Sequence, residues 1–149
     1  MNLLALDTST EWMSIALQRC SGAAAMIWQH HAAGGALASS HLIPEIQRLM
    51  ALADLRYDDL DAVLFGAGPG SFTGLRTACS VAQGLAFGAG ISVLPVDTLL
   101  AVAEDARAQL GLPDTLAVAA MLDARMDQLY AASYVFESDQ WNIRKGYSL

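Results

Sequence analysis

A strand, a glycine loop and a helix follow one another between residues 61 and 87, and this succession limits the fold more than any other feature of the sequence. Residues 61–65 are largely apolar, as in a buried strand, and the next five residues include three glycines and one proline. Helical spacing of apolar and small residues then continues over residues 71–87. A strand that enters a helix through a tight loop is typical of α/β proteins.

Apolar patterns on either side extend this unit. Upstream we expect strands over residues 3–7, 12–18 and 23–31, the last two joined by a turn at Ser21-Gly22, and then a helix capped by Ser39 or Ser40. Downstream we expect a strand over 91–96, a helix from Asp97 or Thr98 to about Gly111, and strands over 115–122 and 128–136.

The expected order is therefore β-β-β-α-β-α-β-α-β-β, which predicts a mixed sheet with flanking helices in the α/β class. The expected strand over residues 91–96 ends at Val96, and we place the boundary between two lobes just after it. The first lobe is residues 1–97 and the second is residues 98–149. Residues 139–149 have little pattern, and no strand or helix is expected there.

Composition excludes several classes of protein. The chain is 54% hydrophobic and only 15% charged, so much of it must be buried. Its net charge is −7 and its basic residues are scattered, apart from Arg144-Lys145, so it should bind RNA poorly by itself. Residues 77–96 are uncharged but contain glycine, serine and proline, which favours buried elements over a membrane span. The N-terminus has no basic region like that of a signal peptide, so a cytoplasmic protein is expected.

The glycine loop could bind an anion, because backbone N–H groups gather where a helix begins. Known phosphate motifs nevertheless fail: Leu75-Arg76 stands where a P-loop has lysine followed by serine or threonine, and Ser71 stands at the third glycine of G-x-G-x-x-G. Pro69 and Thr73 likewise replace the glycines of G-x-S-x-G. A tight turn with Ser71 as helix cap explains the same residues, and both interpretations remain open.

Other polar candidates also have structural explanations. Asp7 ends the first strand, where actin-like kinases hold magnesium, but Thr8-Ser9 follows it instead of a glycine and favours a side-chain turn. His30 and His31 would point to opposite faces of a strand, and His41 fits the first turn of a helix, so no two-histidine metal site is expected. Cys20 and Cys79 are interpreted as reduced, buried thiols.

Two helices carry a possible partner surface. The first has more apolar residues than one sheet face needs, and the second has a row of small residues at four-residue spacing that would let another helix approach. Packing of the second row on the chain's own sheet is an equal alternative. The interface prediction comprises Leu42, Ile43, Ile46, Leu49, Met50, Ala78, Ala82 and Ala86.

Three segments together resemble the bacterial TsaB family, also called YeaZ. They are Leu4-Ala5-Leu6-Asp7-Thr8-Ser9-Thr10, Gly68-Pro69-Gly70-Ser71-Phe72-Thr73-Gly74-Leu75-Arg76 and Asp123-Ala124-Arg125-Met126-Asp127. The middle segment is the specific one. Without the resemblance, the third segment is most simply a charged hairpin turn in which Arg125 pairs with Asp123 or Asp127.

The resemblance implies an actin-like (ASKHA, ribonuclease H-like) fold and a role in making threonylcarbamoyladenosine on tRNA. It implies a scaffold without catalytic residues, metal or cofactor of its own, beside a catalytic TsaD partner that holds the nucleotide and metal. TsaE is a further implied partner, and tRNA is met only through the complex. The helix surface expected to contact TsaD is also the surface through which the isolated chain is expected to form a homodimer. TsaB proteins are usually longer, so a second lobe that is incomplete is expected. An actin-like ATPase or kinase fragment is the alternative function. A peptidase is the third candidate, because no pair of nucleophile and base can be assembled from this sequence.

Overall fold

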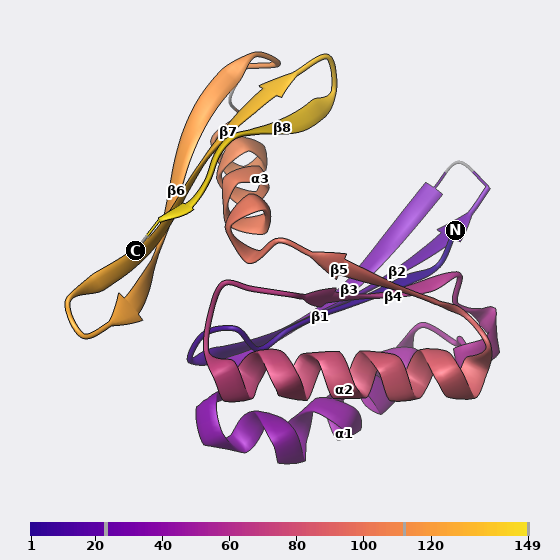
Figure 1. Ribbon diagram of the computed structural model, residues 1–149. Helices are drawn as coiled ribbons and strands as arrows, with labels where there is room; N and C mark the ends of the chain where they lie inside the picture. Colours follow the sequence, from indigo (N-terminus) through magenta and orange to yellow (C-terminus); the bar gives the residue numbers. More distant parts are fainter. Residues whose placement is uncertain (23, 112, 149) are drawn as a thin grey trace. The chain divides into compact units, whose positions relative to one another are not determined.

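The structure is a computed structural model that describes residues 1–22, 24–111 and 113–148. It divides into two compact units, one made of Met1–Ala67 and Ser71–Val96, the other of Gly68–Gly70 and Asp97–Leu149. Each unit is built on its own sheet (Figure 1). No helix in the described ranges is long and apolar enough to cross a membrane.

The first unit holds a five-stranded sheet in the order β3-β2-β1-β4-β5. β1 pairs antiparallel with β2 and parallel with β4, so the sheet is mixed, as expected. Both long helices of this unit lie on the same face of the sheet (Figure 1). In chain order the elements are β1 (Leu3–Asp7), β2 (Trp12–Ser21), β3 (Ala24–Ala33), η1 (Gly35–Leu37), α1 (Ala38–Leu52), η2 (Tyr57–Asp59), β4 (Ala62–Gly66), α2 (Phe72–Ala89) and β5 (Ser92–Val96).

The core of the first unit lies between the sheet and these helices. Alternate residues of β2 point into it, and Met13, Ile15 and Leu17 are all buried, which confirms their expected common face. From the other side, α1 contributes Leu42 and Ile46. The hydrophobic effect of this layer, about 25 cal/mol for each Å² of apolar surface buried, is what holds the helices on the sheet.

The second unit packs α3 (Thr98–Leu110) on a three-stranded antiparallel sheet. Its strands, in the order β6-β7-β8, are β6 (Leu116–Arg125), β7 (Gln128–Glu137) and β8 (Gln140–Ser148). Asp97 caps α3 through its side chain, and Gly111 ends it in the left-handed conformation, as the sequence predicts. Tyr134 is fully buried against α3 residues such as Leu99.

Three expectations are corrected. Residues 139–149 were expected to lack regular structure, but most of them form β8, which is held by pairing with β7. Ser39 and Ser40 do not cap α1: it begins at Ala38 without a side-chain cap, and the Ser40 hydroxyl donates to the Leu37 carbonyl. The cysteines are free, as expected, but partly exposed rather than buried.

Candidate functional site at the junction of β1 and α2

The turn that follows β1 is closed by its own side chains. Asp7 Oδ1 accepts hydrogen bonds from the Ser9 amide at 2.9 Å and from the Ser9 hydroxyl at 2.7 Å. Thr8 and Ser9 are both buried. This is the turn that the sequence predicts, and it commits one oxygen of the Asp7 carboxylate.

The start of α2 is bound directly to this turn. The Ser71 amide donates to the Ser9 carbonyl at 2.6 Å, and the Thr8 hydroxyl donates to the Gly74 carbonyl at 2.6 Å. A Cβ atom at Gly74 would overlap the carbonyl oxygen of Thr8, so only glycine permits this approach. The structure therefore brings the first resemblance segment together with residues 71–76 of the second.

Several of the amides around the glycine loop donate to protein oxygens. Ser71 caps α2 by accepting from the Gly74 amide at 3.4 Å, and the Ala67 amide donates to the Val96 carbonyl at 2.8 Å. Together with the Ser71 amide, which binds the Ser9 carbonyl, these donors face protein oxygens rather than open space. The Ser71 cap expected from the tight-turn interpretation is confirmed.

Gly68–Gly70 belongs to the second unit, where it is fixed to the start of α3. The Gly68 amide donates to Thr98 Oγ1 at 3.2 Å, and the Thr98 amide donates to the Gly68 carbonyl at 2.9 Å. Asp97, next to Thr98, accepts from two amides of α3 and from the hydroxyl of Tyr134 at 2.9 Å. Pro69 follows a cis peptide bond.

Other residues of the resemblance segments face outward. On α2, the Arg76 guanidinium lies 3.7 Å from the centroid of the exposed Phe72 ring, and Thr73 is exposed beside them. In the second unit, the Arg125 amide donates to Asp123 Oδ1 at 2.7 Å, at the tip of the β6–β7 hairpin. The expected hairpin turn is confirmed, but Arg125 contacts Asp123 through its backbone amide.

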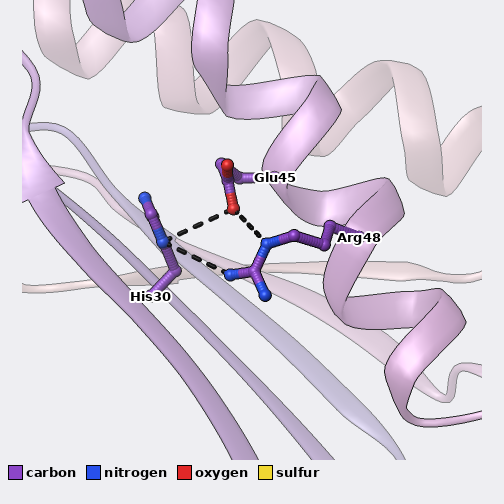
Figure 2. Close-up of polar contacts among 3 residues, drawn as sticks. All are labelled: His30, Glu45 and Arg48. Atoms are coloured by element: carbon purple, nitrogen blue, oxygen red, sulfur yellow. Dashed lines mark hydrogen bonds and ion pairs between the residues drawn. The ribbon is translucent and has the colours of Figure 1, made fainter.

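The histidines do not assemble into one site. His30 on β3 lies 3.4 Å from Glu45 Oε2 and 3.4 Å from the Arg48 guanidinium, both on α1, and Arg48 Nε donates to the same Glu45 oxygen at 2.7 Å (Figure 2). The bond from Arg48, followed by the charge of His30, lowers the pKa of Glu45. On the opposite face of the sheet, His31 pairs with Ser14 at 2.8 Å.

His41 is an exposed residue in the first turn of α1, as expected. Within residues 1–22, 24–111 and 113–148, no three His, Cys, Asp or Glu side chains are grouped so that they could hold a metal ion. The cluster of His30, Glu45 and Arg48 was missed by the sequence analysis, although the i,i+3 spacing of Glu45 and Arg48 was a usable signal.

The expected partner surface is corrected. The sequence analysis treated eight apolar and small residues as an exposed interface, but only Ile43 is exposed. The other seven are buried. The premise of exposed apolar surface is therefore wrong at Leu42, Ile46, Leu49 and Met50, and for the row Ala78, Ala82 and Ala86 the alternative of packing inside the chain agrees with their burial.

A different face of α2 is open. Phe87 is 91% exposed, and a Cβ atom at Gly84 or Gly88 would meet no atom within 4 Å. Small residues also recur every four positions on this face, beginning at Ser80. The sequence could not decide between the two rows, because both consist of small side chains and only packing separates them.

Comparison with known proteins adds the family. The family model described as TsaD, tRNA N6-adenosine threonylcarbamoyltransferase, matches residues 32–148. A protein of Haemophilus influenzae named tRNA threonylcarbamoyladenosine biosynthesis protein TsaB is 39% identical over 140 residues, which are 92% of this chain and 55% of that protein. The Escherichia coli protein of the same name is 35% identical over 134 residues, 90% of this chain and 55% of its own length.

The structure of YeaZ from Pseudomonas aeruginosa superposes with a TM-score of 0.86 at 37% identity, over 99% of this chain and 66% of that one. The chain belongs to the TsaB (YeaZ) family. Its fold is thereby the actin-like α/β fold that the resemblance implied. The chain spans about half the length of the curated relatives it matches.

Proposed function

We propose that the chain serves as a non-catalytic partner subunit that a TsaD protein requires to transfer the threonylcarbamoyl group to adenosine of tRNA. The observation that carries this proposal is the match to TsaB relatives over about nine tenths of the chain. The glycine loop agrees with it, because the amides of Ser71 and Gly74 bind protein oxygens. The relatives are named for the biosynthesis of the modified nucleoside.

The lack of a catalytic role is supported by the junction of β1 and α2. A nucleotide-binding loop needs free backbone N–H groups and room for phosphates next to the strand. Here the amides of Ser71 and Gly74 are bound, and the space next to Gly74 is filled by the carbonyl of Thr8. The same contacts weigh against the alternative of an actin-like ATPase or kinase.

The outer face of α1 and α2 is the surface that we assign to TsaD. It carries the exposed apolar residues Ile43, Leu52 and Phe87, and the exposed glycines Gly84 and Gly88 leave space along α2. This chain matches the TsaD model over residues 32–148, so we expect a TsaD protein to have a related fold with helices at equivalent positions. Two such helix faces can pack closely where small residues leave grooves.

In this proposal the nucleotide and the metal are bound by TsaD, and TsaE joins the same assembly. The net charge of −7 favours tRNA binding through the complex rather than by this chain. The site of action is the cytoplasm.

The test compares bulky substitutions on the two faces of α2. Gly84→Trp fills open space, so the chain should fold while losing TsaD in a pull-down and failing to support tRNA modification with TsaD. Ala82→Trp is placed in the core, where Ala82 is fully buried, and should unfold the chain instead. Leu110→Trp, on the exposed end of α3, is the control that should change neither property.

Circular dichroism reports the fold in each case. A folded Gly84→Trp variant that still binds TsaD places the interface elsewhere. Full tRNA modification by TsaD in the absence of this chain argues against the proposed function itself.

A further inference from the structure

Arg76 is an isolated charge on the exposed side of α2. It is the only Asp, Glu, Lys or Arg among residues 62–96. Within the part of the chain that the structure describes, its guanidinium makes no hydrogen bond and no ion pair. Arg48, Arg56 and Arg107, in contrast, each pair with a carboxylate of their own chain. The five N–H donors of the Arg76 guanidinium are therefore available to another molecule.

The ring of Phe72 holds this guanidinium in place. The guanidinium carbon of Arg76 lies 3.7 Å from the ring centroid, and Phe72 is itself 67% exposed. The two residues are one helical turn apart, so α2 sets their spacing. A guanidinium that stacks on an aromatic ring keeps the N–H groups at its edge free to donate. Because the side chain is ordered in advance, binding costs less conformational entropy.

Arg76 and Phe87 lie on one exposed stripe of α2. Positions 76, 80, 83 and 87 are all exposed, and they follow the three- and four-residue spacing of a single helix face. Phe87 and the neighbouring Gly84 belong to the outer face of α1 and α2 that we assign to TsaD. Arg76 therefore extends that face towards the start of α2.

The composition of this stripe favours a protein carboxylate over a nucleic-acid phosphate. Surfaces that bind phosphate backbones gather several lysines and arginines, whereas α2 has one cation in 18 residues and the chain has a net charge of −7. A single arginine among apolar and small residues is instead typical of the centre of a protein–protein contact. The planar fork of a guanidinium matches a carboxylate through two parallel hydrogen bonds.

We propose that Arg76, positioned by the ring of Phe72, donates two hydrogen bonds to a carboxylate of the TsaD partner. This inference rests on the proposed function, and it adds the chemistry that the partner must present to this end of α2. The pair also fixes the orientation of the two proteins, since the guanidinium fork accepts a carboxylate in one plane.

Calorimetric titration of the full chain with TsaD tests the proposal. Arg76→Ala should weaken binding about tenfold or more, because the partner's carboxylate is then left unpaired. Arg76→Lys keeps the charge without the fork or the stack and should recover only part of the affinity. Arg144→Ala removes one positive charge at an exposed position of β8 and is the control that should bind like the parent chain.

An exchange of charges identifies the carboxylate. Arg76→Glu should abolish measurable binding, since it places two carboxylates against each other. One Asp-to-Arg or Glu-to-Arg substitution on the TsaD helices should then restore binding to Arg76→Glu while weakening binding to the parent chain. Phe72→Leu keeps the apolar bulk but removes the ring, and should weaken binding several-fold.

The outcomes separate this inference from the proposed function. A parent chain that does not bind TsaD refutes the proposed function, and the pair falls with it. A parent chain that binds TsaD no more tightly than Arg76→Ala, or an Arg76→Glu variant that no TsaD substitution rescues, overturns the pair alone. So does an Arg76→Ala variant that binds TsaD normally but weakens tRNA binding by the complex in a gel shift, because the ligand is then a phosphate. Where circular dichroism shows that Arg76→Ala does not fold, Arg76→Lys is read in its place.

Discussion

The contact between Gly74 and Thr8 predicts opposite outcomes for two glycine-to-alanine substitutions in the same helix. Gly74→Ala places a methyl group on the carbonyl oxygen of Thr8, whereas Gly84→Ala places it in open space. Both glycines lie inside α2 and neither has a positive φ, so alanine suits the backbone at both sites. Only the surroundings of the new methyl group differ.

The expected magnitudes follow from opposing effects. Replacing a helix glycine by alanine alone stabilises a protein by about 0.5–1 kcal/mol, and this is the whole effect expected for Gly84→Ala. At Gly74, overpacking against backbone costs about 1–3 kcal/mol. Separating Thr8 from the Gly74 carbonyl, which its buried hydroxyl binds at 2.6 Å, costs about 1–3 kcal/mol more. The net effect of Gly74→Ala is a loss of about 1–5 kcal/mol.

Equilibrium urea unfolding followed by circular dichroism measures both variants against the parent chain. The midpoint should fall for Gly74→Ala and rise slightly for Gly84→Ala, with similar slopes. A Gly74→Ala variant as stable as the Gly84→Ala variant would refute the reasoning, because the turn after β1 could then move away from α2 at no cost.

Three further predictions concern caps, charge and ligands. Asp97→Ala removes the side-chain cap of α3 and should destabilise the chain by about 1–2 kcal/mol in thermal unfolding, while Asp97→Asn, which keeps a capping oxygen, should lose less. Arg48 lowers the folded-state pKa of Glu45, so the resulting stability is present above the ordinary glutamate pKa and declines as pH falls through the lowered one; Glu45→Gln should remove that acid dependence from pH-resolved unfolding curves. Calorimetric titration of the chain with Mg-ATP should show no binding of micromolar strength, about 8 kcal/mol, and a clear isotherm in that range would reopen the question of a nucleotide site.

Local signals in the sequence predict most of the elements of this fold. Alternation marks β2 through Met13, Ile15 and Leu17, and side-chain caps mark the starts of α2 and α3 at Ser71 and Asp97. β8 was missed because its formation depends on pairing with β7 rather than on its own pattern. A strand that is stabilised mainly by pairing with a neighbouring strand need not show a strand pattern in its own sequence.

The candidate site was also predicted only in part, because some of its contacts are local in sequence and others are not. The turn at Asp7 and the cap at Ser71 are local hydrogen bonds, and residue type and spacing predict such bonds. The contact of Thr8 with Gly74 joins segments far apart in sequence, and the choice between buried Ala82 and exposed Gly84 depends on how α2 is rotated against the sheet. The first depends on tertiary structure. The second cannot be predicted from the sequence of α2, because small residues lie on several sides of this helix.

The assignment of Gly68–Gly70 to the second unit has a consequence for how the chain can be cut and assembled. Residues before and after this segment belong to the first unit, so the chain passes into the second unit, returns, and enters it again at Asp97. A fragment that starts at Asp97 would lack the Gly68 carbonyl and amide that bind Thr98. During synthesis, Gly68–Gly70 leaves the ribosome before α3 does. The start of α3 can then form its hydrogen bonds with a segment that was synthesised earlier. The second unit is therefore not separable at a single peptide bond, and its helix completes its hydrogen bonds only on a chain that retains the loop after β4.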